Sequence, residues 1–253
     1  MLPHRRGGRE GYGGRLALSV PLLILVAALV AGCGAPAAAP APTATPAPAP
    51  PTVAELEAGA LVDIGGRRLF ITCANLGAPG PAVIFEAGLA GDHRSWEQVL
   101  PGAAGLARAC SYDRAGLGAS DPGPTPRDAA AVSADLAALL RAAGVPGPYI
   151  LVAHSFGGLF ARRFAADNPD AVAGMVLVDA VHEDWWSEAL AALPPESEGD
   201  SERLRGFRRY LSDEVADPAR NAEGVDIPAA AEQARAAGGL GSRPLIVLTA
   251  GIP

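Results

Sequence analysis

Lysine is absent from this sequence of 253 residues, so all 20 basic side chains are arginines. Charged residues of both signs amount to only 19% of the chain and aromatic residues to 5%. The 27 acidic residues outnumber the basic ones, and the formal net charge is −7. The stretch before Cys33 carries +3 from four arginines and one glutamate, which leaves −10 for the rest. Because nucleic-acid binding requires a basic face, this acidic body argues against nucleic acid as a partner.

The first 33 residues are typical of an export signal. Arginines at positions 5, 6, 9 and 15 precede an apolar run of 15 residues, Leu16 to Val30, which is short for a membrane-spanning helix. The sequence VAGC that follows resembles the lipobox of bacterial lipoproteins, whose cysteine is lipidated and becomes the new N-terminus. We therefore predict a signal peptide over residues 1–33, lipidation of Cys33, and a protein anchored to the membrane of the cell envelope, outside the cytoplasm. The alternative is a plain signal peptide with an incidental cysteine, or an uncleaved anchor helix.

Residues 34–52 contain seven prolines among 19 residues, with alanine and threonine filling most of the rest. Such a segment cannot pack a core, and frequent proline favours an extended, semi-rigid spacer. We therefore predict a linker here that holds one folded domain, residues 53–253, away from the membrane. With 49% apolar residues in the chain, that domain can bury a large core.

Strand-like and helix-like segments alternate along this domain. Helical spacing covers residues 127–143 and 156–167, and apolar runs typical of strands cover 67–74, 81–88, 108–116, 147–155, 171–180 and 243–251. This alternation predicts an α/β fold with a mostly parallel, doubly wound sheet and helices on both faces. Residues from about 181 to 242 are charged, helix-favouring and interrupted by proline. We expect them to form a helical cap over one end of the sheet.

A single serine, Ser155, ends the apolar run ILVAHS, and SFGG leads directly into a helix. A sharp turn from strand to helix places its central residue at the carboxyl end of a sheet, where ligands bind in open α/β folds. Ala153 and Gly157 provide the small residues that such a turn needs. The segment therefore matches the nucleophile elbow G-x-S-x-G with alanine at the first glycine position. A serine that only caps the following helix is the alternative.

A serine hydroxyl needs a base that removes its proton and hydrogen-bond donors that stabilise the oxyanion. The elbow offers the backbone N–H of Phe156 as one donor. The segment EAGLAGDHRSW, residues 86–96, resembles the H-G-x-x-G oxyanion loop with Ala87 in place of the histidine, and Leu89 is then the second donor. An ordinary glycine-rich turn is the alternative.

Four segments together resemble the α/β-hydrolase family, in which they occur in this order: EAGLAGDHRSWEQV, CSYDRAGLGASDPGP, AGVPGPYILVAHSFGG and LVDAVHED. The resemblance covers about residues 63–251. It implies a helical cap after the sixth strand and a Ser-acid-His triad that acts on a small-molecule substrate with no cofactor and no metal. It also implies a mainly structural role for the loop YDRAGLGASD. Members with aspartate at the elbow, such as dehalogenases and epoxide hydrolases, fit less well because this chain has Ser155.

The resemblance also implies a disulfide between Cys73 and Cys110. In the family's strand order the second and fourth strands are neighbours, and these two cysteines lie on them. Lipidation of Cys33 leaves them as an even pair, and export favours oxidation. Two buried free thiols are the alternative.

The base of the triad is not at its usual place. In the family it follows the last strand, a position that falls beyond Pro253, as does the usual acid. Asp179, at the tip of the predicted sixth strand, is a candidate acid. The four histidines are His4 in the predicted signal peptide, His93 in the predicted oxyanion loop, His154 beside the serine and expected to point away from it, and His182 after the sixth strand.

Three interpretations follow. The first is an extracytoplasmic serine hydrolase, most simply an esterase, whose sequence is truncated and lacks the last strand and helix. The second is a complete but catalytically inactive surface binding module, and the third is an active enzyme with His182 as its base. A truncated sheet predicts an exposed edge at 243–251, with Leu245 and Val247 incompletely buried. No obligate protein partner is evident from the sequence.

Overall fold

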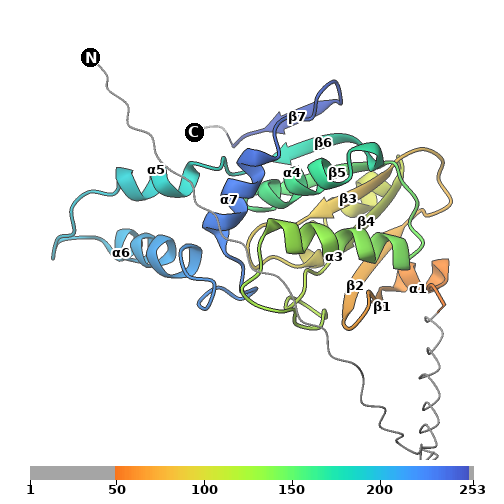
Figure 1. Cartoon of the computed structure of the whole chain (residues 1–253), viewed down its shortest axis with the longest axis horizontal. Helices are drawn as coiled ribbons and strands as arrows, with labels where there is room; N and C mark the ends of the chain where they lie inside the picture. The colour runs from red at the N-terminus through yellow and green to blue at the C-terminus, as the bar shows by residue number, and fades with distance from the viewer. Residues whose placement is uncertain (1–48, 251–253) are drawn as a thin grey trace, which may run out of the picture. The chain divides into compact units, whose positions relative to one another are not determined.

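The computed structural model describes residues 49–250, which form a seven-stranded sheet in the order β1-β2-β4-β3-β5-β6-β7 (Figure 1). β1 pairs antiparallel with β2, and β2 with β4, whereas the other neighbouring strands are parallel. This mostly parallel α/β sheet is the fold predicted from the sequence. The strands are β1 (Ala60–Asp63), β2 (Arg68–Ala74), β3 (Ala82–Glu86), β4 (Arg108–Tyr112), β5 (Tyr149–His154), β6 (Val172–Val178) and β7 (Leu245–Leu248).

The predicted signal peptide, Cys33 and the predicted linker up to residue 48 lie outside the described residues. The first described helix is α1 (Val53–Ala58), which leads into β1. No helix between residues 49 and 250 is both long and apolar enough to span a bilayer.

The central strands are buried on both faces, as expected for parallel strands covered by helices. β4 is buried along its whole length, and β3 along all but one residue. Ile84 and Leu151 belong to the main hydrophobic core on one face of the sheet. Phe85 belongs to a smaller cluster with Trp96, because successive residues of a strand point to opposite faces.

Two helices, α3 (Ala129–Ala142) and α4 (Gly157–Asp167), contribute side chains to the main core, and α7 (Ile227–Ala236) packs against both of them through a second apolar cluster. Figure 1 shows the three helices as a layer in front of the sheet. Side chains of α2 (Leu100–Ala104) and of the 3-10 turn η1 (His93–Trp96) belong to the smaller cluster around Phe85. A second 3-10 turn, η2 (Pro169–Ala171), joins α4 to β6.

The predicted cap divides into two parts. α5 (Trp185–Ala192), α6 (Glu202–Arg209) and the π-helical turn η3 (Tyr210–Val215) contact one another, and Figure 1 shows α5 and α6 to one side of the sheet. By contrast, α7 packs against α3 and α4 and buries an apolar face, so it belongs to the helix layer. The cap proper therefore ends before α7, earlier than residue 242.

The chain between η3 and α7 is attached to the core. Val225 forms an isolated β-bridge with Arg127, just before α3. The Arg127 N–H donates to the Gly224 carbonyl and the Asp226 N–H donates to the Arg127 carbonyl, both at 2.7 Å. The end of the cap is thus fixed beside the start of α3.

Cys73 and Cys110 lie directly opposite each other on β2 and β4. Their sulfurs are 2.12 Å apart in a disulfide, and the two residues are 2% and 0% exposed. The pair therefore crosslinks the two antiparallel strands inside the main core, in the pairing that the sequence predicts.

β7 forms one edge of the sheet, beside β6. Its four aliphatic side chains, Leu245 to Leu248, are 50–55% exposed. The incomplete burial predicted for Leu245 and Val247 is therefore confirmed.

Candidate active site

Ser155 lies directly after β5, at the carboxyl end of the sheet, and is half-buried. Its backbone has φ of +52°, the left-handed region that residues with a side chain rarely adopt. Its N–H donates to the Val178 carbonyl at 3.2 Å, and its carbonyl accepts from the Gly158 N–H at 3.0 Å. Strained backbone of this kind is concentrated at functional sites, and the fold holds it here with bonds to β6 and α4.

Two glycines let the first turn of α4 approach the sheet closely. A Cβ on Gly157 would lie 2.5 Å from the Ala87 carbonyl oxygen, and one on Gly158 would lie 2.7 Å from the Ala180 Cβ. No side chain could be accommodated at either place without a shift. The requirement for small residues after the serine, inferred from the SFGG sequence, therefore has a direct steric cause.

The predicted oxyanion loop lies against the serine. A Cβ on Gly88 would be 3.2 Å from the Ser155 Cβ, so the loop backbone passes beside the serine side chain. Within residues 49–250, the N–H groups of Leu89 and Phe156 donate no hydrogen bond to a protein acceptor. The neighbouring Ala90 N–H, in contrast, is occupied by the Glu223 carboxylate at 2.7 Å. The two N–H groups proposed for the oxyanion are thus available to a ligand, and their assignment stays a prediction.

A buried ionic network lies directly behind this loop. The Arg114 guanidinium is 2% exposed and contacts the carboxylates of Glu86 at 2.5 Å and Glu223 at 2.6 Å. It also donates to the backbone carbonyls of Ala87 at 2.7 Å and Gly88 at 2.6 Å. One buried cation therefore binds two carboxylates and the first half of the predicted oxyanion loop. The charge-assisted hydrogen bonds of such a network are stronger than neutral ones.

The environment of the network raises the pKa of both Glu86 and Arg114, but for different reasons. Burial raises the pKa of Glu86, and the opposing charge of Arg114 and the hydroxyl of Tyr112, which donates to Glu86, offset only part of this effect. Burial alone lowers the pKa of Arg114, but the carboxylates of Glu223 and Glu86 raise it overall. Arg114 is therefore a permanent cation. Its guanidinium carbon also lies 5.1 Å from the centre of the ring of Phe160, a residue of α4, and makes a cation–π contact with it.

No histidine nitrogen in the described part of the chain hydrogen-bonds the Ser155 hydroxyl. His93 instead places its Nδ1 2.7 Å from the Asp113 carboxylate. His154 is exposed and packs edge-on against Trp96, with ring centres 6.4 Å apart. Neither of these two rings is placed to act as the base for Ser155.

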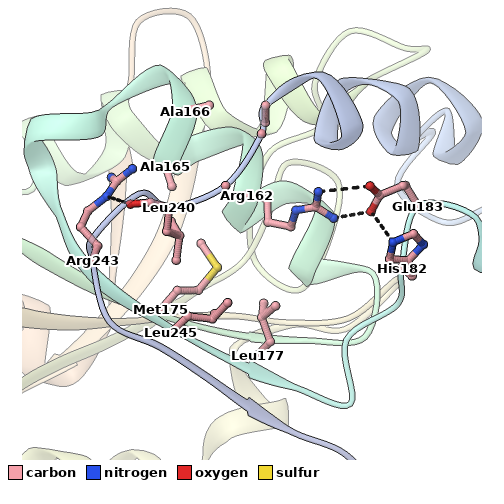
Figure 2. Close-up of a pocket in the computed structure, with 13 residues that line it drawn as sticks. Arg162, Ala165, Ala166, Met175, Leu177, His182, Glu183, Leu240, Arg243 and Leu245 are labelled. Carbon is pink, nitrogen blue, oxygen red and sulfur yellow. Dashed lines mark hydrogen bonds and ion pairs between the residues drawn. The ribbon is translucent and has the colours of Figure 1, made fainter.

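His182 points into a different site. Its ring nitrogens lie 3.5 Å from the carboxylates of Glu183 and Asp184, and its side chain is 65% exposed. It lines a cavity of about 270 Å³ floored by apolar side chains of β6 and β7, and Ser155 is not among the lining residues (Figure 2). Figure 2 shows Arg162 bridging to Glu183, whose pKa this hydrogen bond lowers to about 2.

Asp179, the candidate acid, has φ of +45° at the end of β6 and an exposed side chain. Its N–H donates to the Leu248 carbonyl at 2.7 Å, and its carboxylate accepts from the Ala250 N–H at 3.4 Å. These contacts join the ends of β6 and β7. Within residues 49–250 its carboxylate contacts no histidine, so its role as the acid stays a prediction.

Three potential metal ligands, Asp92, His93 and Asp113, lie within 4.8 Å of one another. Each carboxylate already has a structural task. Asp92 accepts from the Arg94 N–H at 3.0 Å and so begins η1, and the buried Asp113 accepts from the N–H groups of His93 and Ala119, both at 2.8 Å. The cluster therefore fastens η1 to the loop after β4, in agreement with the structural role implied for YDRAGLGASD.

Sequence reasoning did not find the network behind the oxyanion loop. Glu86 and Arg114 occur in segments that were recognised, but their pairing joins positions 28 residues apart. Glu223 is 109 residues from Arg114, in a stretch with no recognisable motif. The one available signal was the acidic residue at the end of the otherwise apolar run VIFE, since a buried carboxylate needs a partner.

Comparison with known proteins places this geometry in a family. The sequence model of the "alpha/beta hydrolase fold" family matches residues 81–216, more than half of the chain. The "Uncharacterized protein YqjL" of Bacillus subtilis is 34% identical over 103 residues, which cover 41% of this chain and 41% of that protein. The "Putative carbamate hydrolase RutD" of Klebsiella pneumoniae is 36% identical over 104 residues, which cover 40% of this chain and 38% of that protein.

The chain thus spans less than half the length of these two curated relatives. Among solved structures, Cfl2 of Burkholderia cenocepacia has a TM-score of 0.53 at 20% sequence identity, over 75% of this chain and 78% of that chain. At that identity the likeness concerns the fold alone. The match of the family model, the sheet order and the serine turn after β5 together show that this chain belongs to the α/β-hydrolase family.

Proposed function

We propose that this protein is a serine hydrolase that acts on carboxylic esters outside the cytoplasm, with Ser155 as its nucleophile. The observation that carries the proposal is the strained backbone of Ser155 at the carboxyl end of β5, beside a loop whose Leu89 N–H, like the Phe156 N–H, has no protein acceptor within residues 49–250. A helix-capping serine needs neither the strain nor the second loop.

The chemistry follows from these positions. The Ser155 Oγ attacks the ester carbonyl carbon while a base takes the hydroxyl proton, and the carbonyl oxygen becomes an oxyanion that accepts hydrogen bonds from the two N–H groups. The alkoxide then leaves with the proton that the base returns. Water hydrolyses the acyl-serine by the same steps and releases the carboxylic acid.

The proposal includes a histidine base from outside residues 49–250, because the three histidines within that range contact other groups. A histidine outside the described residues fits the proposal, with Asp179 or a further residue as the acid. Without such a base we expect no more than the residual rate that oxyanion stabilisation and binding provide, roughly 10³–10⁴-fold over water.

Esters are the substrate class we propose, since they are the least demanding acyl substrates for this machinery. The relative RutD is named for carbamates, so amide-like bonds belong in the same substrate panel. The aromatic side chains Phe156 and Trp185, edge-on with ring centres 5.5 Å apart beside Leu89, favour an apolar acyl or alcohol group.

The test uses a fluorophosphonate probe and an ester panel on protein expressed with the codons that follow residue 253. We expect the label on Ser155, and Ser155→Ala should abolish both labelling and turnover with little change in thermal stability. Ser212→Ala, an exposed serine of η3, is the matched control and should behave as the wild type. Near-normal turnover by Ser155→Ala would refute the assignment.

One observation favours a second function, a catalytically inactive binding module. None of the described histidines hydrogen-bonds the Ser155 hydroxyl. The test is whether the extended protein reacts with the probe or turns over any ester or amide. If it does neither but still binds apolar acids or alcohols, the binding module replaces the enzyme as the proposed function.

Attachment to the membrane through Cys33 is a separate part of the proposal. In cells fed labelled palmitate, the wild-type protein should incorporate the label and Cys33→Ser should not. Label that persists in the serine variant, or an intact N-terminus on membrane-bound protein, would contradict lipidation.

A further inference from the structure

Glu223 lies in the short segment that connects the cap to α7, and its side chain is completely buried. The segment is rigidly held. Asn221 closes it by donating to the Val225 carbonyl at 2.7 Å and accepting from the Val225 N–H at 2.9 Å. Because Val225 also pairs with Arg127 of the core, the Glu223 carboxylate has a fixed position relative to the sheet.

The Glu223 carboxylate reaches the oxyanion loop by two routes. Directly, it accepts from the Ala90 N–H at 2.7 Å. Indirectly, it accepts from Nε and Nη2 of Arg114, each at 2.6 Å, and Arg114 donates onward to the Ala87 and Gly88 carbonyls. The backbone is therefore fixed on both sides of Leu89.

The geometry of the peptide bond shows in which direction these contacts orient the Leu89 N–H. In a trans peptide the C=O and the N–H point to opposite sides of the chain. The Gly88 carbonyl points to Arg114, so the N–H of the same peptide, which belongs to Leu89, points away from Arg114. The Gly88 backbone also lies beside the Ser155 side chain. The network thus decides where the second proposed oxyanion donor is aimed.

We propose that Glu223 is a positioning residue that holds the oxyanion loop, through the Ala90 N–H and through Arg114, in the orientation in which the Leu89 N–H meets the reacting carbonyl oxygen. This inference rests on the proposed serine hydrolase. It assigns part of the catalytic geometry to the segment that connects the cap to α7.

The test compares Glu223→Ala and Glu223→Gln with Glu214→Ala, an exposed glutamate of η3 that serves as the control. Two measurements are made on the extended protein: kcat and KM for an activated ester, and the hydrogen-exchange rate of the Ala90 amide by NMR. Glutamine keeps an acceptor for the Ala90 N–H but loses the charge for Arg114, so it separates the two routes. It also carries the test if the alanine variant does not fold.

We expect Glu223→Ala to lower kcat by about 10- to 100-fold with KM within about twofold, because an oxyanion donor acts mainly in the transition state. Exchange of the Ala90 amide should become at least about tenfold faster, since the carboxylate that accepts from it is lost. Glu223→Gln should fall between the alanine variant and the wild type. Glu214→Ala should match the wild type in both measurements.

Two results would overturn the inference: a Glu223→Ala variant with the kcat of the control, or one whose KM rises while kcat is unchanged. If the wild type hydrolyses nothing, the proposed function fails, and the exchange measurement decides the inference by itself. Unchanged Ala90 exchange in Glu223→Ala then shows that the carboxylate does not hold the loop.

Discussion

Breaking the disulfide between Cys73 and Cys110 should cost this protein a large part of its stability. The crosslink joins residues 37 positions apart, and it restricts the unfolded chain more than the folded one. For a loop of that length the chain-entropy relation gives about 4 kcal/mol at room temperature. Whole domains are stable by only about 5–15 kcal/mol, so the reduced protein should unfold at markedly lower denaturant concentration.

The assay is urea unfolding followed by tryptophan fluorescence, on the oxidised protein and on the same protein reduced at neutral pH. We expect the free energy of unfolding to fall by about 3–4 kcal/mol on reduction. The dependence on urea should become steeper, because the uncrosslinked unfolded chain exposes more surface.

The double variant Cys73→Ala/Cys110→Ala separates the crosslink from the packing of the sulfurs. Both cysteines are buried, so the variant should be less stable than the reduced wild type by the additional loss from the small cavities. Equal unfolding free energies for the oxidised and reduced proteins would refute the entropy argument. Two thiols that react with an alkylating agent in the unreduced protein would refute the crosslink itself.

Two further predictions concern α4. Gly157→Ala should destabilise the protein by about 1–3 kcal/mol, since the new Cβ meets the Ala87 carbonyl oxygen and one of the two backbones must move. Gly102→Ala, where a Cβ meets nothing within 4 Å, is the control, and an equal loss in both variants during thermal unfolding would contradict the steric argument. The Arg162 hydrogen bond lowers the pKa of Glu183 from 4.5 to about 2. The ionised carboxylate therefore stabilises the folded state above pH 4.5. This stabilisation is lost as the pH falls from about 4.5 to about 2. In urea unfolding over that pH range, the free energy of unfolding should fall less for Arg162→Met than for the wild type. Parallel pH profiles of the two proteins would disprove this stabilising role of the Arg162–Glu183 pair.

The elements that carry a strong local pattern were predictable from the sequence. The apolar run before Ser155 and the helical spacing after it predicted 147–155 and 156–167, and the structure has β5 at Tyr149–His154 and α4 at Gly157–Asp167. The sequence did not predict α2, because its five residues LPGAA are too few to show a helical period and include a glycine. Its helix depends on packing of Leu100 against the cluster around Phe85, which no local pattern encodes.

The candidate site divides in the same way. The serine turn is specified by adjacent small residues, so a single sequence reveals it. The groups that orient the oxyanion loop come from three distant places, Glu86, Arg114 and Glu223, and only the fold brings them together. Which histidine acts as the base for Ser155 also depends on long-range geometry. The sequence could therefore list candidate histidines but could not choose among them.

The bridge between Arg127 and Val225 has a consequence for how this domain could be rebuilt or diversified. The stretch from α5 to η3 could be exchanged as a module for new substrate preferences if the new segment reproduces the apolar packing of Trp185 and Val215 around Phe156. The ten residues from Pro218 to Ile227 are not part of that module, because they carry Asn221, Glu223 and the bridge itself. A chimera that joins a foreign cap before Pro218 should keep its oxyanion loop in place, whereas one joined after Ile227 should lose it.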